Sequence, residues 1–150
     1  MSADRPILVS ACLAGYPCRY DRTQRLNEKV RDMVRDGRAI PICPEQLAGL
    51  GAPRMKIEFD SEGGGGAVLD GVERAHFEDA TDCTDVLMRA SDEVLRLARL
   101  YDVAGAVLKD GSPSCGVTYV YTAGRRVPGR GVAAERLVRD GIEVKGVDSL

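Results

Sequence analysis

The sequence predicts an α/β fold in which a mostly parallel sheet is flanked by helices in a Rossmann-like arrangement. Short, continuously apolar segments such as residues 7–9 and 105–108 are typical of strands buried on both faces. Segments with apolar residues at helical spacing lie between them, and this alternation favours parallel strands joined by crossover helices. The 150 residues, 44% of them hydrophobic, suffice for one core, so we expect one domain over residues 1–150.

The first part of the chain supplies a strand, a loop and a helix. Residues 7–9 form the expected strand, and residues 13–23 contain glycine, proline and aspartate, which is typical of a loop. Residues 27–35 place apolar side chains at helical spacing. Asn27 is a suitable N-cap for this helix, and Gly37 is a suitable stop.

The middle of the chain contains a second strand, a glycine-rich loop and the longest helix. Residues 39–42 are the expected strand. Residues 50–66 carry glycine, proline and charge and end in four glycines, which predicts a flexible, lid-like loop. Residues 81–101 form the expected long helix, capped by Thr81 or Asp82. Its predicted apolar stripe consists of Val86, Ala90, Val94, Leu97 and Tyr101.

The last third continues the alternation. Residues 105–108 form a third strand, which the loop 109–116 follows. Residues 117–121 are rich in β-branched and aromatic side chains, as in strands. Residues 132–139 form the last expected helix, and residues 142–147 form the final strand.

Composition argues against several classes of function. The chain has 21 Lys and Arg against 23 Asp and Glu, a net charge of −2, so it lacks the basic footprint expected of a protein that binds whole nucleic acid. No apolar run approaches the roughly 20 residues of a membrane span. The N-terminus shows no basic segment followed by an apolar stretch, so we expect a cytoplasmic protein, and a monomer.

The five cysteines are the most informative residues. Their odd number without a secretory signal argues against a disulfide framework. Cys12, Cys43 and Cys115 each follow the carboxyl end of an expected strand, where open α/β sheets form their sites, so we expect them to converge. Cys18 lies in the same loop as Cys12 and could join them. Cys83, in the first turn of the long helix, is expected to be structural.

Converging cysteines allow three kinds of chemistry. Zinc would use four ligands in a structural site, or three with one open position in a catalytic site. An iron–sulfur cluster held by three thiolates would leave one iron open to a substrate atom. A single nucleophilic thiolate needs a nearby base, but the only histidine, His76, is expected in a distant loop.

Polar residues beside the cysteines add possible proton chemistry. Glu45 follows Cys43 by two residues and could donate a proton or simply cap a turn. Ser112 and Ser114 precede Cys115; such hydroxyls either bond the backbone or lie at an open coordination position. Residues 124–131 combine glycines and arginines before a helix, which suits an anion site or a solvated basic loop.

Four motifs in order resemble the thiouracil desulfidase family. They are residues 9–15 (Val-Ser-Ala-Cys-Leu-Ala-Gly) with 18–21 (Cys-Arg-Tyr-Asp), residues 43–47 (Cys-Pro-Glu-Gln-Leu), Pro53-Arg54, and residues 108–109 with 112–116 (Ser-Pro-Ser-Cys-Gly). Gly129, Gly131 and the segment 141–144 also fit. The resemblance extends over nearly the whole chain.

The resemblance implies a [4Fe-4S] cluster that activates a small thiolated nucleobase such as thiouracil. One iron would be free to bind the substrate sulfur, and the reaction would leave the oxo base. The implied cluster ligands are Cys12, Cys43 and Cys115, and the implied catalytic residues are Glu45 and Ser112. Two alternatives stay open: a non-enzymatic zinc or iron–sulfur module that binds metal or senses redox state, and a thiol-dependent transferase using Cys18 or Cys115.

Overall fold

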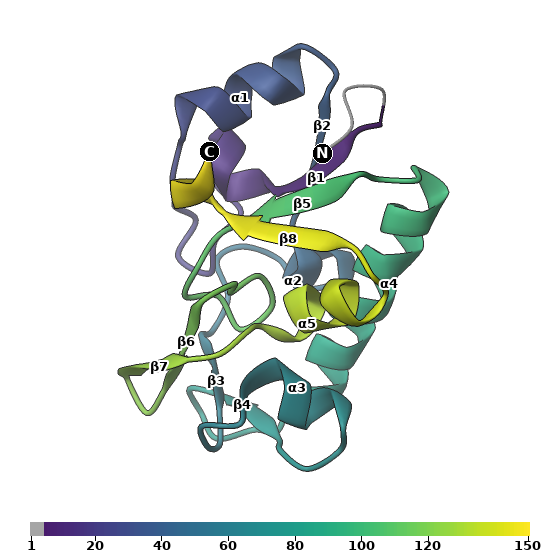
Figure 1. The fold of residues 1–150 in the computed structure, drawn as a ribbon. Helices are drawn as coiled ribbons and strands as arrows, with labels where there is room; N and C mark the ends of the chain where they lie inside the picture. Colours follow the sequence, from purple (N-terminus) through teal and green to yellow (C-terminus); the bar gives the residue numbers. More distant parts are fainter. Residues whose placement is uncertain (1–4) are drawn as a thin grey trace.

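Four parallel strands form the central sheet of the structure, a computed structural model that describes residues 5–150 (Figure 1). The strand order is β2 (Ala39–Ile42), β1 (Ile7–Ser10), β5 (Gly105–Leu108) and β8 (Glu143–Gly146). Ile7 pairs with Ala39 on one side and with Gly105 on the other. The predicted parallel α/β fold is confirmed. All residues of the two central strands are buried, which explains their continuous apolar sequence.

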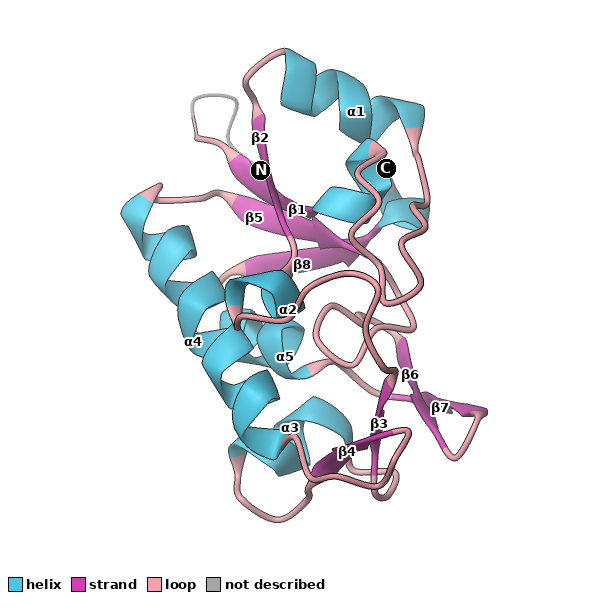
Figure 2. Ribbon diagram, turned by 180° about the vertical axis from the view of Figure 1, so that it is seen from behind, coloured by secondary structure: helices cyan, strands magenta, loops and turns pink. Residues whose placement is uncertain are grey.

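Helices cover both faces of this sheet, as the two opposite views show (Figures 1 and 2). One face carries α1 (Glu28–Arg35), and its core joins Val30 to Ile7 and Val9. The other face carries α4 (Thr84–Leu100) and α5 (Val132–Arg139), which pack on Leu8 and neighbouring strand residues. Alternate residues of β1 therefore serve opposite cores, as the two-residue period of a strand requires.

Helix α1 begins where the sequence predicts. The Asn27 side chain accepts a hydrogen bond from the backbone N–H of Val30 at 3.2 Å, and Gly37 has a φ of +74° just beyond the helix. An amide oxygen that caps the free N–H groups of the first turn stabilises the helix start. The left-handed glycine then ends it.

The prediction of a flexible loop over residues 50–66 is wrong beyond residue 56, where the chain forms regular structure. This segment contains β3 (Ile57–Phe59), which pairs antiparallel with β4 (Ala75–Phe77), and it leads into α3 (Gly64–Leu69). The glycines there allow close packing. A Cβ at Gly65 would fall 2.4 Å from the carbonyl oxygen of Gly131, so only glycine lets α3 approach the start of α5.

The long helix differs from its prediction at its start and in its buried face. It begins at Thr84 with Cys83 as N-cap, so Cys83 lies before the first turn; the Asp82 carboxylate accepts from the Thr84 N–H at 3.0 Å. Ala90 and Val94 are fully buried as expected. Tyr101 is 47% exposed, and the buried face instead includes Leu87, Ser91, Leu95 and Ala98.

Two smaller features complete the fold. The β-rich segment forms β6 (Tyr119–Thr122), which pairs with β7 (Arg125–Pro128) in a separate two-stranded sheet. His76 lies on β4 rather than in the expected loop, and its ring contacts Asp60. None of the helices in the described part of the chain is long and apolar enough to cross a membrane.

Candidate functional site

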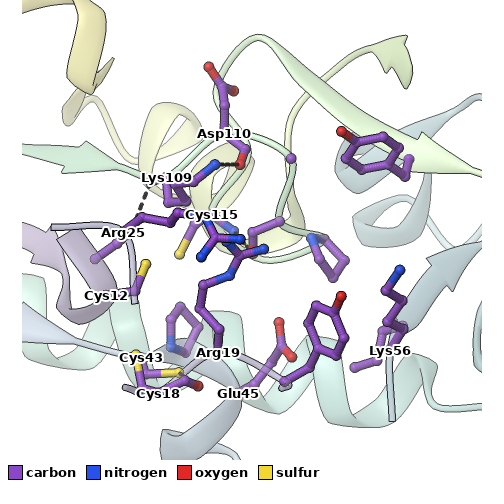
Figure 3. Close-up of a pocket in the computed structure, with 18 of the residues that line it drawn as sticks. Cys12, Cys18, Arg19, Arg25, Cys43, Glu45, Lys56, Lys109, Asp110 and Cys115 are labelled. Carbon is purple, nitrogen blue, oxygen red and sulfur yellow. Dashed lines mark hydrogen bonds between the residues drawn. The ribbon is translucent and has the colours of Figure 1, made fainter. Parts of the chain in front are cut away.

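Four cysteines from separate turns line one cavity of about 500 Å³ at the carboxyl edge of the sheet (Figure 3). Cys12 lies in the 3-10 turn Ala11–Ala14 directly after β1, and Cys43 is the N-cap of α2 (Pro44–Leu47) directly after β2. Cys115 follows β5, and Cys18 lies in the loop after Cys12. Parallel strands bring these turns together, since their carboxyl ends share one edge. Cys83 and His76 are not among the lining residues.

The thiols of Cys43, Cys18 and Cys12 are close enough to shift one another's pKa, and Cys43 Sγ donates to the Cys18 carbonyl at 3.7 Å. Hydrogen bonding from the Cys18 thiol lowers the pKa of Cys12 below its usual value, and the same interaction raises the pKa of Cys18 to about 11. Hydrogen bonding from the Cys43 thiol to Cys18 likewise raises the pKa of Cys43. Donation stabilises the acceptor thiolate and disfavours ionisation of the donor, so Cys12 is the thiol best able to carry negative charge.

The loop that carries Cys115 is held by its own serine. The Ser112 hydroxyl accepts from the backbone N–H of Ser114 at 3.1 Å and from that of Cys115 at 2.9 Å. Ser112 also lines the cavity. Burial raises the pKa of Cys115 to about 12, even though hydrogen bonds with Ser10 and Ser112 oppose that shift. The loop thus presents a buried sulfur at a fixed place.

Helix α5 anchors the same loop through its first turn. The N–H of Val132 donates to the carbonyl of Pro113 at 2.8 Å, and the N–H of Ala134 donates to the carbonyl of Ser114 at 3.1 Å. These free N–H groups of the helix start are therefore satisfied by the protein itself. Of the two readings of residues 124–131, the structure does not support the anion site.

Glu45 is buried at the floor of the site, with a partner for each carboxylate oxygen. Arg54 Nε donates to Oε1 at 3.0 Å, and the Ser114 hydroxyl donates to Oε2 at 3.1 Å. Counted over the whole residue, Glu45 is only 7% exposed. Arg54 also donates to the carbonyl of Cys18 at 2.8 Å, so one guanidinium joins the carboxylate to the cysteine loop.

The sequence alone does not predict these two partners of Glu45. Arg54 is nine residues away, in a segment expected to be flexible, and Ser114 is 69 residues away. The one sequence feature that indicates a role for Arg54 is the Pro53-Arg54 motif, since a specific motif is not expected in a loop that is only flexible. Ser114 belongs to the motif 112–116, but its contact with Glu45 is not predictable from that motif, because it depends on β5 lying two strands from β2.

The charge around the cavity is mainly positive. Its lining includes five cationic side chains and three carboxylates: Arg19, Arg25, Arg54, Lys56 and Lys109 against Glu45, Glu58 and Asp110. Burial lowers the pKa of Lys109, and the nearby Arg19 lowers it further. This field favours a site whose contents are anionic, as thiolate sulfurs are.

The cysteines that approach the cavity from separate turns are the thiol donors that iron–sulfur clusters use. Within residues 5–150, no three His, Cys, Asp or Glu side chains gather closely enough to hold one ion. Structural zinc needs four ligands directed at one point. The thiolates of an iron–sulfur cluster bind different irons and therefore stand apart. Cys12, Cys43 and Cys115 approach one cavity from three turns, an arrangement that is compatible with the second pattern.

Comparisons with known proteins agree with this picture. Residues 7–148 match the family model described as 2-thiouracil desulfurase. The chain is 35% identical over 141 residues to the uncharacterized protein YbbK of Bacillus subtilis (strain 168), covering 92% of this chain and 93% of that protein. It is also similar to the solved structure of the [4Fe-4S]-dependent thiouracil desulfidase TudS, with a TM-score of 0.84, 32% identity, and coverage of 97% and 93% of the two chains.

Proposed function

Since the chain belongs to the 2-thiouracil desulfurase family, a family of sulfur-removing enzymes, we propose that it converts a thiolated pyrimidine into the oxo base. The balanced reaction consumes one water and releases one hydrogen sulfide, without oxidation or reduction. The proposal includes a [4Fe-4S] cluster, the cofactor on which the similar desulfidase TudS depends. Its proposed ligands in this chain are Cys12, Cys43 and Cys115. The observation that carries it is the convergence of these cysteines and Glu45 on one cavity.

When bound, the cluster would supply a Lewis-acidic iron for the substrate sulfur, which otherwise leaves poorly from carbon. Three protein ligands leave one iron without a protein thiolate. Cys18 lies beside two of these ligands, and its hydrogen bonds orient them without making it a ligand itself. Cys83, buried at the start of α4, serves packing only.

Ser112 is suited to orient the attacking water. Its oxygen already accepts two backbone hydrogen bonds, and its one hydroxyl hydrogen can turn from the Cys115 sulfur to a water in the cavity. A water that accepts this hydrogen is held with its other lone pair available for the sulfur-bearing carbon. Glu45 is the proton-transfer group: it takes a proton as water adds and returns it to the departing sulfur or the ring.

We also propose that the substrate is a free base or similarly small molecule and that the chain works as a monomer. A cavity of about 500 Å³ accommodates such a ligand, and the overall net charge of −2 does not favour binding of a folded RNA. Light scattering on the loaded protein should give the mass of one chain. A mass of two chains would overturn the monomer proposal alone.

Anaerobic purification followed by iron and acid-labile sulfide counts tests the cofactor first. We expect a brown protein with about four of each per chain. Turnover is then followed by the loss of thiouracil absorbance and the release of sulfide. A protein that takes up no iron on reconstitution, or binds zinc instead, would overturn the proposal.

Cysteine variants test the ligand set. Replacing Cys12, Cys43 or Cys115 by serine should abolish or sharply reduce cluster loading. Cys83→Ala is the matched control and should load iron like the wild type, since Cys83 does not line the cavity. Cys18→Ala should also retain the cluster. Loss of the cluster in the Cys83 or Cys18 variant would overturn the ligand assignment.

A further inference from the structure

Tyrosines gather at the cavity although aromatic residues are scarce in this chain. Only 5% of residues are aromatic and none is Trp, yet three of the five tyrosines line the cavity: Tyr20, Tyr119 and Tyr121. Tyr119 and Tyr121 are alternate residues of β6, so they share one face of the strand. Flat, polarisable surfaces of this kind suit a planar ligand.

The ring of Tyr119 is fixed by neighbours on β6 and β7. The guanidinium of Arg126 lies 3.9 Å from its centroid, within the range of a cation–π contact. Arg126 is exposed and does not line the cavity, so it supports the ring from outside. Tyr121 and Tyr119 form a T-shaped pair, with ring centroids 5.9 Å apart and planes at 89°. These contacts hold the ring in place before any ligand arrives.

The same ring is tied to the loop that carries Ser112. Gly111 has a φ of +82°, and a Cβ there would fall 3.2 Å from Tyr119 Cε2. Its N–H donates to the Tyr119 carbonyl at 3.1 Å. The Asp110 carboxylate accepts from the Tyr119 N–H at 3.3 Å. Tyr119 therefore keeps a set position relative to Ser112 and to the Cys115 loop.

We propose that Tyr119 is a substrate-binding residue that stacks on the planar ring of the thiolated base. This inference rests on the proposed function and adds the group that orients the base. Stacking on one face leaves the edge of the base free, so the sulfur can point toward the cysteines. In Figure 3 the four cysteines lie together on one side of the cavity, and Lys56 lies on the other side. Because every base has a π-face, the contact tolerates different ring substituents.

Three variants of the anaerobically reconstituted protein test the proposal. Tyr119→Leu removes the aromatic face and should raise the KM for thiouracil and the Kd for uracil about tenfold, with kcat changed less than about twofold. Tyr119→Phe keeps the face and should keep both constants near the wild-type values. Tyr101→Leu is the matched control, because Tyr101 is a tyrosine outside the cavity. Calorimetry with uracil gives the Kd without any turnover.

The outcomes separate this proposal from the proposed function. Turnover with an unchanged KM and Kd in Tyr119→Leu overturns the stacking role alone. The same holds if the affinity for the base is lost in Tyr20→Leu and kept in Tyr119→Leu. A weaker Kd in Tyr119→Leu, in a protein that never desulfurates thiouracil, overturns the proposed reaction alone. A wild type that binds neither base overturns both. Melting curves check folding, and Tyr119→Val replaces the leucine variant if that one does not fold.

Discussion

Glu45 is the residue whose chemistry depends most on its surroundings. Its carboxylate is buried, and it is held by Arg54 on one oxygen and by Ser114 on the other. Two fixed partners determine where the carboxylate lies, so a proton on it is delivered to one place. This arrangement suits Glu45, two residues after the proposed ligand Cys43, to the proposed proton transfer rather than to capping a turn.

Replacing Glu45 by Gln should remove turnover but not the cluster. Glutamine keeps the shape and can still accept from Arg54, but it cannot exchange a proton. We expect kcat to fall by at least about 100-fold, the usual contribution of a general acid or base. Iron content and the visible spectrum should stay unchanged. Glu58→Gln, another carboxylate of the cavity lining, is the control, and retained turnover in Glu45→Gln would remove Glu45 from the mechanism.

Arg54 should matter for stability as well as for activity. The side chains of Arg54 and Glu45 are 9% and 10% exposed, so their ion pair is largely removed from water. Arg54→Met would leave the Glu45 carboxylate buried without its countercharge and should lower the free energy of unfolding by about 3 kcal/mol. Urea denaturation measures this loss. The double variant with Glu45→Gln should regain part of it, because no buried charge is then left alone; equal losses in the single and double variants would contradict this reasoning.

At the level of elements, the loop 109–116 is organised by one carboxylate. Asp110 accepts from the N–H groups of Val117 and Thr118 at 2.8 and 2.7 Å, and from the Thr118 hydroxyl at 2.8 Å. Burial alone raises the pKa of Asp110, but the hydrogen bonds from Thr118 and Val117 together outweigh it and hold the pKa below its ordinary value of 3.8. Asp110 thereby closes the loop that carries Ser112 and Cys115 onto β6.

Because the pKa of Asp110 is lowered, the hydrogen bonds that its carboxylate accepts from Val117 and Thr118 are sensitive to acid. Its contribution to stability is present above the ordinary pKa of 3.8 and is lost as the pH falls through the lower folded-state value. We therefore expect Asp110→Asn to melt at a lower temperature than the wild type near pH 7. Below about pH 4 the difference should shrink, because the unfolded chain then binds the proton first, and it should be lost once the pH falls below the lower folded-state pKa. Thermal melts over pH 2–7 measure it, with the exposed Asp148→Asn as control; a difference that stays constant with pH would contradict the role of the charge.

Helices and strands were predictable where the periodicity of apolar residues is strong. They were missed where they depend on contacts with residues that are distant in the sequence. The buried strands and the Asn27 cap follow from local sequence, because apolar runs and caps act over a few residues. The glycines at 63–66 suggest flexibility locally, but Gly65 is required by the backbone of Gly131. The face of α4 is likewise selected by the packing of α2, α3 and α5 rather than by its own spacing alone.

At the scale of the whole molecule, the site is a product of topology. Strands β2, β1 and β5 are neighbours in the sheet, so the turns after them meet although Cys12 and Cys115 are far apart in sequence. The convergence of cysteines was therefore predictable once three parallel strands were recognised. The partners of Glu45 and the tyrosine lining were not, since they depend on how the loops after those strands and the β6–β7 sheet fold back over the edge.

This topology means that a bound cluster should link separate parts of the fold. Ligands that come from three turns cannot hold one cluster in the unfolded chain as they do in the native one, so binding energy adds to stability. We expect the reconstituted protein to melt several degrees above the metal-free protein, and an iron chelator to remove the difference. Calorimetry under anaerobic conditions measures both melting temperatures. Cys83→Ala should keep the full difference and Cys115→Ser should lose it, because only the second thiol faces the cavity. Equal melting temperatures with and without iron would mean that the three turns do not share a cluster.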